Sequence, residues 1–234
     1  MAAALTGAFK AALFRSPVAR GAALSAAQGA VAQRVAALAT PPSERIAWDL
    51  YNWPHPSIGV VHLDLAELLA KRPAEHGLVR QLYWWWGACV AALALNLVDS
   101  LVLVSVVRGG AAYSPLAPFY SVLSLLSLGG AAFTVLRAWY HGACESSGRS
   151  KTIARGVLAL LCFLWLLYAL MPSGNVLGLA GFAQSARHEH ALSDGTPAAA
   201  VAFWQAATAY ESLIFAALFG WSCYLAYRLL THAG

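Results

Sequence analysis

The chain has 234 residues, of which 60% are hydrophobic and only 11% are charged. Soluble domains carry about a quarter charged residues, so this composition excludes an ordinary water-exposed surface and makes a membrane the expected solvent. The net charge of +5 does not indicate nucleic-acid binding, because the basic residues stand beside apolar runs and form no separate basic domain. We therefore expect an all-α integral membrane protein.

Residues 1–43 form a basic, alanine-rich segment that contains no acidic residue. Leu5, Phe9 and Leu13 recur at four-residue spacing, which predicts an amphipathic helix on the membrane surface. The same basic, acid-free composition is typical of a mitochondrial or plastid transit peptide. Composition does not separate these two interpretations, and both stay open.

Residues 44–81 are predicted to form a juxtamembrane segment on the cytosolic side. Its first part is rich in aromatic residues and proline, which predicts extended chain: Trp48, Tyr51, Trp53, Pro54 and Pro56. Helical spacing returns in "LDLAELLAKR", where Leu65, Leu68 and Leu69 fall on one side. We expect this short helix to lie flat on the membrane and to end at Lys71 and Arg72.

Four apolar runs are long enough to span a hydrocarbon core, which needs about 20 residues. They predict a four-helix transmembrane domain over residues 82–234, with spans at about 82–107, 118–136, 153–170 and 203–230. The first run opens with "LYWWW", typical of an interfacial aromatic belt. Between the third and fourth runs, "PSGNVLGLAGFAQS" is too apolar for an ordinary loop and too rich in glycine for a span. It is expected to lie along the interface or to form a short re-entrant segment.

The distribution of Lys and Arg in the short loops predicts the orientation of the spans. Arg108 and Arg187 fall on one side of the membrane. The other side collects most of the bases: Lys71, Arg72, Arg80, Arg137, Arg149, Lys151, Arg155 and Arg228. This asymmetry places both termini in the cytosol, or in the matrix for a mitochondrial protein.

Several short motifs together resemble those of the secretory carrier membrane proteins. Asn52, Trp53 and Pro54 precede "IGVVHLDLAE" and four spans, and the second span leaves the membrane through Trp139 and Tyr140. "MPSGNVLGLAGF" follows the third span, and "YESL" lies in the fourth. The resemblance implies a four-span protein of vesicle trafficking and protein transport in Golgi, endosome and plasma-membrane vesicles. The Asn-Pro-Phe repeats of that family are absent, so the resemblance identifies a divergent member and does not extend to endocytic adaptors.

The stretch "AWYHGACESSGRSK", residues 138–151, is predicted to be a cytosolic loop between the second and third spans. Trp139 and Tyr140, together with Arg149, Lys151 and Arg155, make it a candidate surface for lipid headgroups, including anionic phosphoinositides, because each base near an anionic leaflet contributes about 1 kcal/mol. Asn52, Trp53 and Pro54 are grouped with it as a candidate lipid- or partner-binding surface. The alternative is that the bases only determine topology. Cys144 is a candidate for palmitoylation.

Two carboxyl groups lie inside the predicted spans, Asp99 in the first and Glu211 in the fourth. Charged groups at this depth cost a few kcal/mol, so each requires a structural or functional reason. The predicted topology puts both at similar depth, where no span carries a Lys or Arg; Arg155 and Arg228 stand only at span ends. They are expected either to stay protonated and bonded between helices, with Asn96 as a partner, or to share a proton or cation in a transport site.

Small residues predict helix packing. Thr208, Ser212, Ala216 and Gly220 repeat every four residues in the fourth span, which allows close helix approach within the bundle or between copies. A second stripe at three-residue spacing lies in the second span: Ser121, Ser124, Ser127 and Gly130. The "RHEHALSD" stretch (His188, Glu189, His190 and Asp194) is expected to be a solvated loop rather than a metal site, and His62 with Asp64 is a still weaker metal-binding pattern.

We expect no catalytic residues, no metal and no cofactor, because the sequence has no nucleophile elbow, phosphate loop, HExxH or dinucleotide-binding glycine pattern. The leading hypothesis is a non-enzymatic protein of vesicle trafficking. Its expected partners are membrane lipids and other membrane proteins, in a homo-oligomer or a larger complex, and not nucleic acid. The alternatives are an accessory subunit of a mitochondrial inner-membrane complex and a small proton- or cation-coupled transporter that uses Asp99 and Glu211.

Overall fold

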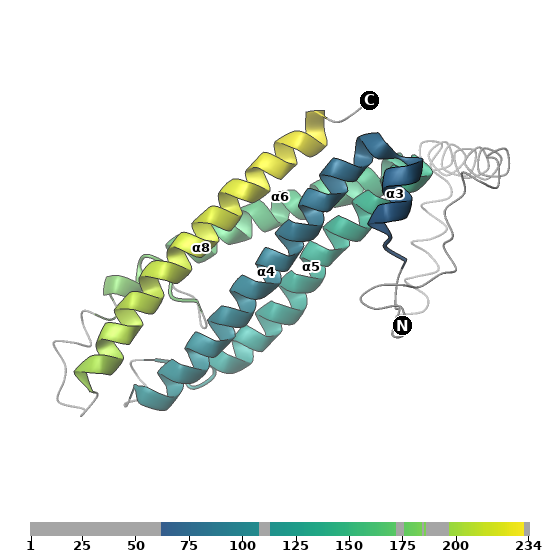
Figure 1. The fold of residues 1–234 in the computed structure, drawn as a ribbon. Helices are drawn as coiled ribbons and strands as arrows, with labels where there is room; N and C mark the ends of the chain where they lie inside the picture. Colours follow the sequence, from purple (N-terminus) through teal and green to yellow (C-terminus); the bar gives the residue numbers. More distant parts are fainter. Residues whose placement is uncertain (1–61, 108–112, 172–175, 184, 186–196, 232–234) are drawn as a thin grey trace, which may run out of the picture. The chain divides into compact units, whose positions relative to one another are not determined.

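The computed structural model describes residues 62–107, 113–171, 176–183, 185 and 197–231, and this part of the chain is helical and contains no strand. Five helices are labelled in Figure 1: α3 (Leu65–Lys71), α4 (Pro73–Val106), α5 (Ala117–Glu145), α6 (Gly148–Leu170) and α8 (Ala198–Thr231). The last four are long and apolar enough to cross a membrane. The prediction of an all-α integral membrane protein with four spanning helices is therefore confirmed. The predicted amphipathic or transit segment, residues 1–43, lies outside the described residues.

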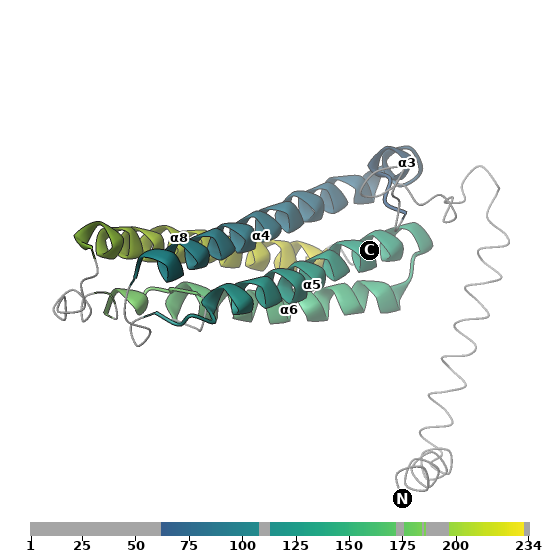
Figure 2. The same cartoon turned by 90° about the horizontal axis from the view of Figure 1, so that it is seen from below.

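The four long helices pack as an antiparallel bundle, which Figures 1 and 2 show from two directions. α4 packs against α5 and α8, and α6 packs against the same two helices. The start of α4, the turn between α5 and α6, and the end of α8 consequently share one end of the bundle. We call it the Ser147 end, after the residue in that turn, and the opposite end the Tyr113 end.

All four helices extend beyond the predicted spans: α4, α5 and α6 at the Ser147 end, and α8 mainly at the Tyr113 end. α4 begins at Pro73 rather than at residue 82, and α5 continues past residue 136 to Glu145. At 1.5 Å per residue, the 34 residues of α4 reach about 51 Å, against a hydrocarbon core of about 30 Å. Hydropathy marks only the part of a helix that lies in hydrocarbon, whereas the backbone hydrogen bonds continue into polar sequence. The predicted loop at residues 138–151 is therefore mostly helix, and only Ser146 and Ser147 separate α5 from α6.

The interior of the bundle is aromatic, and a few polar bonds fix the register of its helices. Trp165 of α6 stacks on Phe215 of α8, with ring centroids 5.8 Å apart. Trp85 of α4 donates its indole N–H to Ser222 of α8 at 2.9 Å. Apolar residues gain nothing by leaving lipid, so packing and such bonds hold membrane helices together. Large apolar side chains are exposed on the outside of the bundle: Trp84, Leu126, Leu160, Phe163 and Leu213.

Only half of each predicted stripe of small residues is buried in the bundle. Thr208 and Ser212 are buried in the bundle, whereas Ala216 and Gly220 are exposed on its outer face. Residues four apart in an α-helix advance by 400°, so a strict four-residue stripe drifts by about 40° per step away from a straight interface. The buried face of α8 instead alternates steps of three and four: Trp204, Thr208, Glu211, Phe215, Leu218, Ser222, Leu225 and Leu229. The stripe in α5 divides in the same way, with Ser121 and Ser124 buried and Ser127 and Gly130 exposed.

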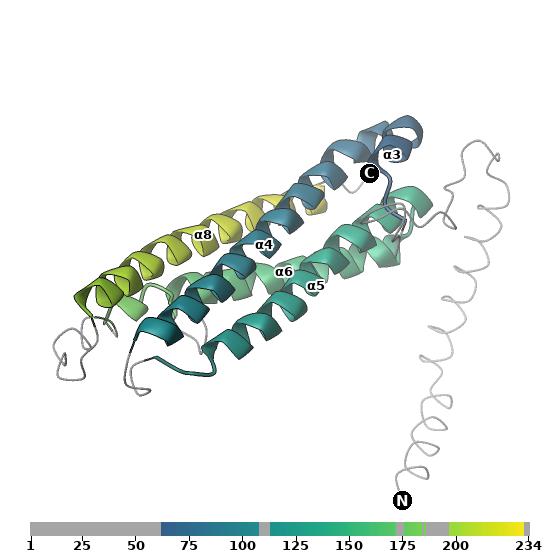
Figure 3. The same ribbon diagram turned by 60° about the horizontal axis from the view of Figure 1, so that its bottom comes forward.

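The short helix predicted before the first span is present as α3, and it packs on α4 (Figure 3). Asp64 caps its N-terminus by accepting hydrogen bonds from the backbone N–H groups of Ala66 and Glu67, at 2.9 and 3.0 Å. Leu68 is fully buried, whereas Leu69 is exposed. Of the predicted apolar face, Leu68 therefore supplies the main contact that anchors α3 to the bundle.

After α6 the chain turns back on itself, in residues 176–183, which we call the return segment. Leu179 and Ala180 donate their backbone N–H groups to the carbonyls of Ala169 and Leu170, at 2.9 and 3.0 Å. These bonds satisfy carbonyls at the end of α6 that have no partner within the helix. Val176 and Leu177 are buried in the bundle. Of the two expectations for this stretch, the contacts favour a segment that re-enters the bundle over one that lies along the interface.

Gly178 makes this turn possible. Its φ of +50° lies in the left-handed region, and a Cβ placed there would overlap the backbone of Met171. A side chain at this position is therefore excluded on two separate grounds, backbone conformation and space.

We predict that Gly178→Ala destabilises the protein, because it adds left-handed strain of about 1–2 kcal/mol to the overlap with Met171. Thermal unfolding of the purified protein in detergent should shift to lower temperature. Gly220→Ala is the matched control, since a Cβ at Gly220 meets nothing within 4 Å and alanine favours a helix. Equal midpoints for Gly178→Ala and the wild type would contradict the described turn.

Candidate functional site

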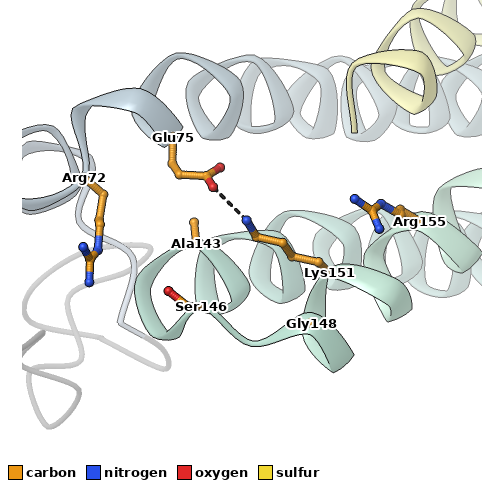
Figure 4. A pocket seen from close by; sticks show the side chains of 7 residues that line it. All are labelled: Arg72, Glu75, Ala143, Ser146, Gly148, Lys151 and Arg155. Carbon is orange, nitrogen blue, oxygen red and sulfur yellow. Dashed lines mark hydrogen bonds and ion pairs between the residues drawn. The ribbon is translucent and has the colours of Figure 1, made fainter. Parts of the chain in front are cut away.

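A basic pocket opens at the Ser147 end of the bundle, where it encloses about 480 Å³ (Figure 4). It is lined by residues from α5, α6, the α5–α6 turn and the junction of α3 with α4: Arg72, Glu75, Ala143, Ser146, Gly148, Lys151 and Arg155. Three basic side chains and one carboxylate leave two positive charges in excess. The pocket is therefore suited to a small anion with more than one negative charge.

Lys151 and Arg155 stand one turn apart on α6 and share a support beneath them. The indole ring of Trp139, in α5, lies 5.2 Å from Lys151 Nζ and 5.7 Å from the Arg155 guanidinium carbon. Cations are attracted to the face of an indole ring at such distances. Arg155 Nε also donates to the carbonyl of Leu229 at the end of α8, at 3.0 Å. These contacts hold both side chains in place before any ligand binds.

The opposite wall comes from the junction of α3 and α4. Arg72 ends α3, and Glu75 lies in the first turn of α4. Lys151 Nζ and Glu75 Oε1 are 2.8 Å apart, an ion pair that joins α6 to α4 across the pocket (Figure 4). Because Glu75 neutralises one of the three bases, Arg72 and Arg155 carry the net charge of the pocket.

The turn between α5 and α6 brings these bases close to a helix N-terminus. Ser147 caps α6 by accepting the N–H of Ser150, at 3.4 Å. Gly142 of α5 allows the close approach, because a Cβ there would lie 2.7 Å from Lys151 Cγ. The first N–H groups of a helix and its dipole favour an anion, whereas bases at the same position are not favoured by the dipole. An anion in the pocket would stabilise both the bases and the start of α6.

Trp139 and Tyr140 were expected to face lipid headgroups, and this expectation is wrong for both side chains. Trp139 is fully buried and Tyr140 is 1% exposed. The cause is the extension of α5 to Glu145, which turns both residues into the bundle. Trp139 supports the bases of the pocket, and the Tyr140 hydroxyl accepts the backbone N–H of Asp64 at 3.2 Å, joining α5 to the start of α3.

The structure assigns different positions to the other residues of the predicted headgroup surface. Lys151 and Arg155 line the pocket, whereas Arg149 is exposed on α6 and does not line it. Cys144 is only 7% exposed, so its thiol is not presented for palmitoylation in this conformation.

Asn52, Trp53 and Pro54 lie outside the described residues, as do the four residues picked out in the "RHEHALSD" stretch. His62 is buried, and its Nε2 lies 2.8 Å from Glu67 Oε2 rather than at Asp64.

The three polar residues predicted inside the spans are brought together. Asn96 Nδ2 donates to the Glu211 carboxylate, at 3.2 Å to Oε1, and the buried Asp99 follows Asn96 by about one helical turn on α4. The two carboxyl groups therefore lie at the same level of neighbouring helices, as the predicted topology required.

Sequence reasoning missed Arg72 and Glu75 as parts of a site. Arg72 was assigned only to the end of the surface helix and to the bases that indicate topology, and Glu75 had no assigned role. Lys151 and Glu75 are 76 positions apart, and no local pattern relates them. The one usable signal was that the acidic Glu75 stands just before the first predicted span, on the side that collects the bases.

Comparisons of the chain with protein-family models, with curated proteins and with solved structures found no match.

We predict that Tyr140→Phe loosens α3 from the bundle, because the Asp64 N–H then loses its partner in α5. A hydrogen bond of this kind contributes about 1 kcal/mol, which corresponds to roughly fivefold faster local opening. Hydrogen–deuterium exchange of the peptide that covers residues 62–71 measures it. Exchange in α6 should stay unchanged, and unchanged exchange in α3 would contradict the assigned contact.

Proposed function

We propose that this protein is a non-enzymatic component of vesicle membranes, and that its basic pocket binds the phosphorylated headgroups of anionic lipids in the cytosolic leaflet. The observation that carries the proposal is the convergence of Arg72, Lys151 and Arg155 on one cavity beside the start of α6. Topology alone requires only that bases remain on one side of the membrane, and it does not require them to share a cavity.

The size and chemistry of the pocket fit a phosphoinositide headgroup. Sites for small molecules enclose about 300–1,000 Å³, and 480 Å³ lies in this range. Arginine binds phosphate through two parallel N–H groups. Arg72 and Arg155 stand on opposite sides of the Lys151–Glu75 pair (Figure 4). A phosphate monoester carries more than one negative charge, so it matches the excess of two positive charges better than the single phosphodiester of most lipids.

The expected orientation places this pocket on the cytosolic side. Every Lys and Arg among the described residues lies near the Ser147 end: Lys71, Arg72, Arg80, Arg137, Arg149, Lys151, Arg155 and Arg228. The positive-inside rule assigns such an end to the cytosol. Helices that extend past the hydrocarbon there would hold the pocket at headgroup depth.

Assignment to vesicle trafficking rests on the resemblance to secretory carrier membrane proteins, and the pocket is compatible with it. Trafficking membranes are distinguished by the phosphoinositides of their cytosolic leaflets. A four-helix protein with a preformed headgroup site could use these lipids to choose the membrane in which it accumulates.

We predict that Arg72→Gln and Arg155→Gln each weaken binding of a short-chain phosphatidylinositol phosphate by about fivefold, since each base contributes about 1 kcal/mol. The triple variant with Lys151→Gln should lose on the order of 100-fold. Calorimetry on the purified protein in uncharged detergent gives the affinity, with short-chain phosphatidylserine as the weaker comparison ligand.

Arg149→Gln is the matched control, because it removes the same charge from the same helix outside the pocket. It should leave the affinity within about twofold, as expected for a screened surface charge. If Arg149→Gln weakens binding as much as Arg155→Gln, the bases act only as a diffuse surface charge, and the pocket has no special role.

A second prediction concerns the compartment. A C-terminally tagged full-length protein in its own cell should give endomembrane puncta, and N-terminal sequencing of the purified product should find residues 1–43 retained. Mitochondrial fluorescence with an N-terminus trimmed near Arg20 or Arg34 would overturn trafficking in favour of the mitochondrial subunit.

A further inference from the structure

A polar cluster lies in the interior of the bundle, between the Ser147 end and the Tyr113 end. Asn96, Asp99, Ser121 and Glu211 are each at most 3% exposed. They come from three helices, α4, α5 and α8, and the return segment adds the backbone N–H of Leu177. This cluster has no part in the basic pocket, so the inference below does not depend on the proposed function.

The cluster carries two acids and no base. Among the described residues, the charged or titratable groups that act on Glu211 and its surroundings are Asp99, Tyr210 and Tyr113. Two buried carboxyl groups this close together cannot both be ionised in a medium of low polarity unless a positive charge lies near them. The arrangement therefore requires one bound cation, and a proton is the smallest that satisfies it.

The two carboxyl groups have different surroundings. Glu211 accepts the Asn96 amide at 3.2 and 3.3 Å and the Leu177 N–H at 3.3 Å. Asn96 is itself fixed, because its Oδ1 accepts the Ser121 hydroxyl at 3.0 Å. In contrast, Asp99 Oδ2 is buried and has no hydrogen-bond partner among the described residues. Hydrogen bonds thus hold the Glu211 carboxylate in place, whereas Asp99 has a carboxyl oxygen that is available to a ligand.

We propose that Asp99 and Glu211 form an exchangeable site for one monovalent cation, either H⁺ or Na⁺, held between their carboxylates. Tyr210, which stands beside Glu211 on α8 and interacts electrostatically with Asp99, offers its hydroxyl as a further neutral ligand. Oxygen ligands with a net negative charge suit small hard cations. One bound cation leaves a single negative charge on the pair, which the Asn96 amide and the Leu177 N–H stabilise at Glu211.

The backbone around the site supports exchange rather than permanent burial. Leu177 donates its N–H to Glu211, while its side chain packs with Leu103 and Trp204 toward the Tyr113 end. Irregular backbone at membrane depth occurs where it is enclosed by protein or lines a site, and ion sites of transporters use such discontinuous segments. Movement of the return segment would uncover the carboxyl pair from the Tyr113 end.

The test uses the wild-type protein in detergent and N,N′-dicyclohexylcarbodiimide, which modifies protonated carboxyl groups in apolar surroundings. Peptide mass spectrometry should find the modification at Glu211 or Asp99, with a rate that falls as the pH rises. If Na⁺ is the cation, NaCl should slow the modification relative to choline chloride, about tenfold when Na⁺ is at ten times its dissociation constant. A dependence on pH alone identifies the proton as the cation.

Asp99→Asn removes one charge of the pair, so it should abolish protection by Na⁺ and change the pH dependence. Glu145→Gln removes an exposed carboxylate and should change neither. The experiment on the wild-type protein tests the proposed cation site even if Asp99→Asn does not fold. Absence of modification at both carboxyl groups, or a rate independent of both pH and Na⁺, would overturn the proposal.

Discussion

The hydrogen bonds that converge on Glu211 join the helices of the bundle inside the hydrocarbon core, where polar groups cannot pair with water. Asn96 from α4 and Leu177 from the return segment donate to this one carboxyl group, and Ser121 from α5 fixes Asn96. Four separate segments are thereby set at one level. In a bilayer an unsatisfied polar group costs several kcal/mol, so these segments cannot slide past one another without losing the bonds together.

The same constraint separates the two polar sites of the protein. Glu211 and Arg228 lie 17 residues apart on α8, about 26 Å along the helix axis. With the carboxyl pair inside the hydrocarbon, the Ser147 end lies at or beyond the headgroups. The acids are therefore held where charge is costly and must be compensated locally, and the bases where water and lipid phosphates are available. Neither group neutralises the other, so each site keeps its own chemistry.

The sequence predicted those features that depend on composition and helix length. Four spans followed from apolar runs, and the similar depth of Asp99 and Glu211 followed from counting residues along antiparallel helices. Features that depend on which face a residue takes were less predictable. Trp139 and Tyr140 stand at the edge of the apolar run, where aromatic residues often meet headgroups. Only the continuation of α5 to Glu145 turns them inward. Similarly, a four-residue repeat identified Thr208 and Ser212 but also Ala216 and Gly220, which the helix rotates outward.

That continuation of α5 also decides what the Ser147 end can do. If residues 138–151 formed a flexible loop, Lys151 and Arg155 would attract anionic lipid only through their charge, and Arg149 would be equivalent to them. Because the turn contains only two residues and Gly142 lets Lys151 pack against α5, the two bases are instead fixed over Trp139 and face Glu75 and Arg72. Fixed donors lose less conformational entropy on binding than free ones. The hairpin thus converts a distribution of charge, which any membrane protein needs for its topology, into a pocket with a defined shape.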